Sequence, residues 1–130
     1  MPVGDPIYMA IQSHEFDVLN EWALLSDDEL KGVVSDDSIA FLQGVVSLLS
    51  DEKKGNEISV SRNNFVSTVR EMRRRYQTGS RLLGQAILEA SDWLDKQQRG
   101  KAKEVYERFL LSCSSRFYRE IAENQLKKLS

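Results

Sequence analysis

Proline occurs only twice in this 130-residue chain, at Pro2 and Pro6, and both positions lie at its extreme start. Because proline lacks a backbone N–H and disrupts helix interiors, its absence from residue 7 onward leaves the rest of the chain free to form helices. Apolar side chains recur there at intervals of three and four residues, the spacing of one helix face. A short helix is expected at residues 7–11, and only residues 58–61 alternate as a strand would. The sequence therefore predicts an all-α protein.

Serine and glycine positions divide the expected helices. Ser26 followed by Glu29 has the pattern of a capping box, in which each side chain bonds the other residue's backbone N–H. Gly79 suits the C-terminal cap of one helix and Ser80 the start of the next, which Gly100 then ends. We therefore expect six or seven antiparallel helices in a helical-hairpin or bundle architecture.

Residues 50–64 form the clearest loop, because they are polar and contain Gly55. This loop separates an acidic N-terminal half from a basic C-terminal half within a single helical domain, residues 1–130. Trp93 lies in a wide apolar arc with Ala90, so we expect its side chain to be buried in the core.

The net charge of −2 hides an uneven distribution. Residues 1–60 hold 12 acidic and 3 basic side chains and carry −9, whereas residues 61–130 hold 8 acidic and 15 basic side chains and carry +7. Such asymmetry has two interpretations. Either the two halves pack together and neutralise each other's field, or one half faces a partner of opposite charge.

The composition excludes most catalytic and metal chemistry. One cysteine, Cys113, and one histidine, His14, leave no internal disulfide, no cysteine-built zinc site and no scheme that needs two histidines. No glycine-rich phosphate loop is present, so we expect no catalytic residues, no metal ligands, no cofactor and no enzymatic activity. The chain also lacks a stretch long and apolar enough to span a membrane, and its start lacks the features of a secretion signal. We expect a cytoplasmic protein with no membrane partner.

Two resemblances to known families follow from these features. Ala90, Trp93, Ala102 and Tyr106 have spacings similar to the small and aromatic positions of a tetratricopeptide unit, so residues 86–110 partly resemble one such helical hairpin. The size, helicity and acidic patches of the whole chain resemble those of small bacterial immunity proteins, which neutralise a cognate toxin in the cytoplasm. The second resemblance implies a binding protein without catalysis.

The acidic half supplies the residues for such binding. Capping needs only one serine or carboxylate at each helix start, so adjacent acids there are surplus to it. We expect a non-enzymatic protein that binds a basic protein partner, a toxin domain, and occludes its active site. The expected partner-binding residues are an aromatic anchor and the acids around two helix starts: Trp22, Asp27, Asp28, Glu29, Asp36 and Asp37.

Two alternatives remain open. The chain could be a helical-hairpin adaptor or chaperone that binds a peptide segment in a groove between helices. It could also be a nucleic-acid-binding regulator that uses the arginines of residues 70–75, which are Arg70, Arg73, Arg74 and Arg75. The sequence pI near 5.5 disfavours a nucleic-acid partner.

Overall fold

A computed structural model describes residues 14–50, 58–113 and 115–130. Every regular element of these residues is a helix, which confirms the all-α prediction, and their number agrees with the expected six or seven. The helix expected at residues 7–11 lies outside the described residues. The described helices are α2 (His14–Ala23), α3 (Asp27–Val33), α4 (Asp36–Leu48), α5 (Phe65–Asp95), α6 (Arg99–Ser112) and α7 (Arg116–Leu129).

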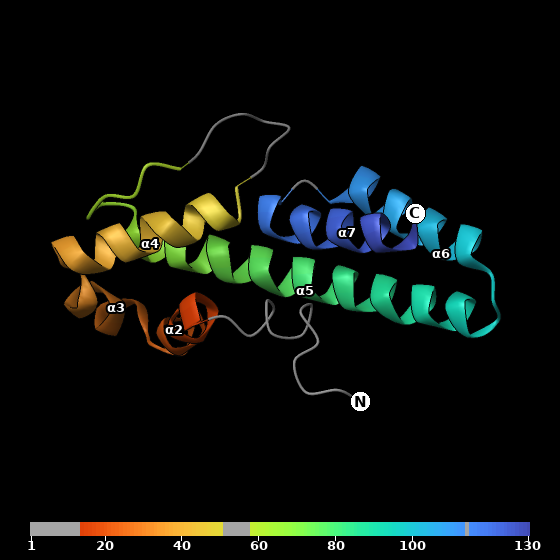
Figure 1. The fold of residues 1–130 in the computed structure, drawn as a ribbon. Coiled ribbons are helices and arrows are strands. Elements are labelled where there is room, and N and C mark those ends of the chain that lie inside the picture. Colours follow the sequence, from red (N-terminus) through yellow and green to blue (C-terminus); the bar gives the residue numbers. More distant parts are fainter. Residues whose placement is uncertain (1–13, 51–57, 114) are drawn as a thin grey trace.

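Helix α5 is the element against which the others pack. Its 31 residues give a length of about 46 Å at 1.5 Å per residue. Helices α2, α3 and α4 lie along its first half, and α6 and α7 lie along its second half (Figure 1). One core of buried apolar side chains runs between these helices and includes residues from both halves of the chain.

The prediction that Gly79 and Ser80 separate two helices is wrong, because α5 continues through both residues. Gly79 instead allows a close approach of α7. The ring of Tyr118 is buried against Gly79, where a Cβ atom would lie 2.2 Å from the ring. The Tyr118 hydroxyl donates to the carbonyl oxygen of Tyr76 at 3.0 Å and lies 2.9 Å from the Ser80 hydroxyl. The packing of the Tyr118 ring on Gly79 and the hydrogen bonds of the Tyr118 hydroxyl therefore fix α7 to the middle of α5.

The prediction that Gly100 ends this helix is also wrong. Helix α5 ends at Asp95 in a Schellman motif, with the Gln98 N–H bonded to the Trp93 carbonyl at 2.8 Å and the Gln97 N–H bonded to the Leu94 carbonyl at 3.0 Å. Gln97 occupies the left-handed position at φ 60°, which glycine usually fills. Gly100 lies in the first turn of α6.

Trp93 is only half-buried, contrary to the prediction of a core residue. It lies two residues before the end of α5, close to the turn that leads into α6. The ammonium groups of Lys96 and Lys101 lie 5.1 and 4.4 Å from its ring centroid. Ala90, one turn earlier, is fully buried as expected.

The loop expected at residues 50–64 is irregular in the part that the structure describes, residues 58–64. The Gln43 side chain holds it to α4, because its amide donates to the Ile58 carbonyl at 2.9 Å and accepts from the Val60 N–H at 2.9 Å. Residues 58–61, which alternate as a strand would, thus form backbone hydrogen bonds with the Gln43 side chain. They belong to no sheet among the described residues.

Candidate protein-binding surface

Two capping boxes position the acidic residues at the starts of α3 and α4. The Ser26 hydroxyl accepts from the Glu29 N–H at 3.1 Å, and the Glu29 carboxylate accepts from the Ser26 N–H at 2.9 Å. The Ser35 hydroxyl accepts from the Ser38 N–H at 3.1 Å, and the Ser38 hydroxyl accepts from the Ser35 N–H at 2.8 Å. Glu29 is therefore the one acid among the predicted site residues that serves as a cap.

The remaining acids differ in how strongly the fold uses them. Asp27 pairs with Arg70 of α5 at 3.0 Å. Asp36 lies 3.5 Å from Arg62, and Asp28 lies 3.9 Å from Lys31, yet these two carboxylates are 98% and 97% exposed. Asp37 is exposed and has no ion pair among the described residues. We call these five acids, Asp27, Asp28, Glu29, Asp36 and Asp37, the acidic end, and Asp28, Asp36 and Asp37 are the ones least engaged by the fold.

Hydrogen bonds from Ser26 lower the pKa of the Glu29 carboxyl, with the backbone N–H as the larger cause. Glu29 therefore stays ionised while it caps α3, and its charge adds to the field of its neighbours. The positive end of each helix dipole also favours these negative charges. The helix starts therefore favour acidic side chains at all five positions of the acidic end.

The structure packs Trp22 against two other aromatic rings. Its centroid lies 5.5 Å from that of Phe41 and 5.4 Å from that of Phe65, and the side chain is half-buried. The exposed apolar side chain of this region is Leu24, which is 85% exposed just after α2 ends. The sequence did not indicate that Leu24 is exposed, because Leu24 continues the apolar pattern of α2. Its side chain is exposed because the helix ends one residue earlier, at Ala23.

Three arginines cap the C-terminal ends of other helices. Helices α2, α4 and α6 have no basic residue in their own last turns. Arg70 donates to the Ala23 and Leu25 carbonyls after α2 at 2.9 and 2.7 Å. Arg75 donates to the Leu49 carbonyl after α4 at 3.2 Å.

Arg119 of α7 completes this set at the end of α6. It donates to the Leu110 and Cys113 carbonyls at 2.5 and 3.0 Å. The last carbonyls of a helix lack partners within that helix and carry the negative end of its dipole, so a guanidinium satisfies both needs. Much of the positive charge of the second half therefore serves the fold.

The other two arginines of residues 70–75 also have partners within the chain. Arg73 donates to the Asn20 side chain of α2. Arg74 binds both carboxylate oxygens of Glu71, at 2.9 and 2.6 Å. Arg70, Arg73 and Arg75 therefore link α5 to other helices, and Arg74 pairs within α5. Each of these four arginines already has an acceptor inside the protein.

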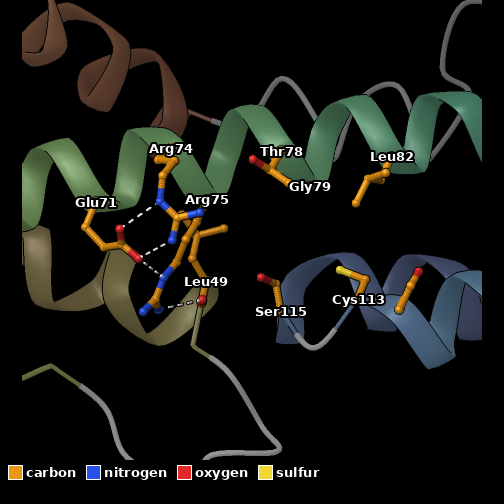
Figure 2. Close-up of a pocket in the computed structure, with 10 residues that line it drawn as sticks. Leu49, Glu71, Arg74, Arg75, Thr78, Gly79, Leu82, Cys113 and Ser115 are labelled. Atoms are coloured by element: carbon orange, nitrogen blue, oxygen red, sulfur yellow. Dashed lines mark hydrogen bonds and ion pairs between the residues drawn. The ribbon is translucent and has the colours of Figure 1, made fainter.

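A cleft of about 210 Å³ lies where α4, α5 and the α6–α7 connection meet (Figure 2). Glu71 lies between Arg74 and Arg75 along one side, and Thr78, Ser112 and Ser115 add hydroxyl groups. The hydrogen bond from Arg74 is the main cause of the lowered pKa of the Glu71 carboxyl. The charged groups of this cleft are thus paired with one another.

The described residues contain no cluster of three acidic, histidine or cysteine side chains that could hold a metal ion. Cys113 is buried at the C-terminal cap of α6, with its N–H bonded to the Phe109 carbonyl at 2.8 Å. The side chain of His14 lies outside the described residues. No described helix combines the length and hydrophobicity needed to cross a bilayer.

Comparisons with protein-family models, with characterised proteins and with solved structures gave no significant match.

Proposed function

We propose that this chain is a non-enzymatic protein-binding protein whose acidic end docks on a basic protein. The observation that carries the proposal is the pair of helix starts capped by serines, which leaves Asp28, Asp36 and Asp37 exposed beside them. Carboxylates that caps do not need remain available to steer and orient a positively charged partner. In its most specific form, the partner is a bacterial toxin domain whose basic active-site cleft the acidic end occludes.

Leu24 supplies the apolar contact that such a surface requires. Binding energy concentrates in a few buried side chains, whereas exposed charges at the rim mainly change the association rate. Leu24 projects from the segment that joins α2 to α3, directly before the first capping box. It therefore replaces half-buried Trp22 as the proposed anchor, and Trp22 supports the segment from beneath through Phe41 and Phe65.

The alternatives have less support. A regulator that grips nucleic acid through residues 70–75 would have to compete with the carbonyl, amide and carboxylate groups that these arginines already bind. An adaptor for a peptide segment has a location in the cleft of Figure 2, but the Glu71 carboxylate already binds both arginines there.

Binding kinetics with purified basic toxin domains test the proposal. We expect Asp28→Asn with Asp37→Asn to slow association roughly threefold to tenfold at low salt, because steering depends on the local field. The matched control is Glu104→Gln with Glu107→Gln, which removes the same charge from exposed positions on α6. Equal association rates for the two variants would exclude the acidic end as the docking surface.

The role of Leu24 as the anchor is tested by measuring the dissociation rate of the complex. We expect Leu24→Ala to speed dissociation, because it removes buried apolar area from the complex and leaves steering unchanged. Its exposure in the free protein predicts an unchanged melting temperature. Leu111→Ala, which truncates another exposed leucine on α6, is the control.

A further inference from the structure

The tip of the α5–α6 hairpin, residues 92–103, is a second charged surface that the proposed function does not use. Four of its side chains are basic: Lys96, Arg99, Lys101 and Lys103. The exposed acids Asp92 and Asp95 precede them, so the tip carries a net charge of +2. Half-buried Trp93 and Leu94, which is 39% exposed, provide apolar surface beside these cations.

Local interactions account for only part of these cations: Lys96 and Lys101 lie over the Trp93 ring, whereas Arg99 and Lys103 have no ion pair among the described residues. The N-cap residue of α6, Gln98, makes no side-chain cap, and the first turn of the helix has no acid and holds Arg99 and Lys101 instead. Positive side chains are unfavourable there, because the N-terminal end of a helix is itself positive. Residues that oppose local preference mark positions where another interaction compensates.

The tip and the acidic end lie at opposite ends of the molecule (Figure 1). The acidic end surrounds the starts of α3 and α4, beside the first half of α5, while the tip follows the last residue of α5. Helix α5 extends about 46 Å between them. Exposed charges are screened beyond about 8 Å at physiological ionic strength, so the two ends cannot neutralise each other within one molecule.

We propose that the hairpin tip of one copy docks on the acidic end of a second copy. The basic side chains of the tip then face Asp28, Asp36 and Asp37, and Trp93 or Leu94 covers Leu24. Because the two surfaces differ, the contact is heterologous, and a pair of copies keeps one free tip on one copy and one free acidic end on the other. The contact therefore propagates head to tail, and it covers the surface that the proposed function assigns to a foreign partner.

Sedimentation velocity on the purified chain tests this contact. At about 50 mM salt we expect the weight-average mass to rise at least twofold between about 10 µM and 1 mM protein. At about 500 mM salt we expect only monomer, because the Debye length falls from about 14 Å to about 4 Å and screens the attraction between the exposed charges. Monomer at every concentration in low salt would overturn the proposal.

Two variants, each of which lacks the charges of one of the two surfaces, test whether the contact joins the tip of one copy to the acidic end of another. The tip variant is Arg99→Gln with Lys101→Gln, and the acidic-end variant is Asp28→Asn with Asp37→Asn. Each variant alone is expected to stay monomeric, whereas an equimolar mixture forms a 1:1 complex and nothing larger, because one intact tip meets one intact acidic end. Association of either variant alone would indicate a symmetric dimer and overturn the proposal.

The control variant is Lys127→Gln with Lys128→Gln, which removes two exposed cations from the end of α7 and should associate as the unmodified chain does. The tip variant also separates this proposal from the proposed function. It keeps the acidic end intact, so its binding to a basic toxin domain should survive although self-association is lost. Circular dichroism of each variant checks that the fold is retained.

Discussion

Gly79 is the residue at which the packing of α7 on α5 depends on the absence of a side chain. A Cβ atom would lie 2.2–2.8 Å from three ring carbons of Tyr118, which is fully buried. We expect Gly79→Ala to destabilise the fold by about 1–3 kcal/mol in chemical denaturation, because the buried ring must move. Gly84→Ala, five residues along the same helix with nothing within 4 Å of its Cβ, should instead stabilise it by about 0.5–1 kcal/mol.

The Ser26–Glu29 capping box and Gly79 show which roles of a residue can be predicted from the sequence. Ser26 and Glu29 were predictable as a capping box, because every contact that defines it lies within four residues. Gly79 gave the signal of a helix end, yet its neighbour Tyr118 lies 39 positions away in the chain. A single sequence does not distinguish a glycine that ends a helix from one that admits a ring from another helix.

At the scale of the element, arginines supplied by neighbouring helices cap α2, α4 and α6. Arg119 has 21% of its side chain exposed and also lies 3.7 Å from Glu123, whereas Arg116 on the same helix is 55% exposed and, among the described residues, pairs with Glu120 at 3.3 Å. We expect Arg119→Ala to cost about 1–2 kcal/mol of unfolding free energy, because two carbonyls at the end of α6 lose their donor. Arg116→Ala should cost about 0–0.5 kcal/mol, as surface ion pairs do. Similar losses for both variants would show that capping is not the main role of Arg119.

The end of α5 was not predictable for a related reason. Gln97 adopts the left-handed conformation although it is not glycine, so no local signal marks this turn. We expect Gln97→Gly to raise the unfolding free energy by about 0.5–1 kcal/mol, because it relieves the unfavourable φ of an L-residue. Gln98→Gly, at an ordinary φ of −104°, should lower it. A loss of stability in both variants would contradict the strain at Gln97.

At the scale of the whole molecule, pairing between the two halves accounts for part of the charge asymmetry that the sequence shows. Arg62 and Arg70 pair with Asp36 and Asp27 across the two halves, so part of the imbalance is neutralised internally. Counting charges revealed the imbalance, but only the packing of α3 and α4 beside α5 shows which carboxylates remain exposed. The all-α class was predictable from local periodicity, whereas the composition of the acidic end required these tertiary pairings.

Acid should destabilise the molecule through two hydrogen-bonded carboxyls, those of Glu71 and Glu29. Hydrogen bonds lower the pKa values of the Glu71 and Glu29 carboxyls from the usual 4.5. Such a group stabilises the folded state above its unfolded-state pKa, and that contribution is lost as the pH falls through the lower folded-state pKa. We therefore expect the melting temperature to fall as the pH drops below about 4.5, because the Glu71 and Glu29 carboxyls then become protonated in the folded state.

The contribution of Glu71 to this acid dependence can be isolated with one substitution. Glu71→Gln keeps the shape of the side chain but removes the charge between Arg74 and Arg75, so we expect a lower melting temperature at pH 7 and a shallower decline between pH 5 and 3. The control is Glu107→Gln, at an exposed position without an ion pair among the described residues, which should leave both quantities unchanged. Parallel pH profiles for the unmodified chain and Glu71→Gln would show that the Glu71 carboxylate does not link α5 stability to pH.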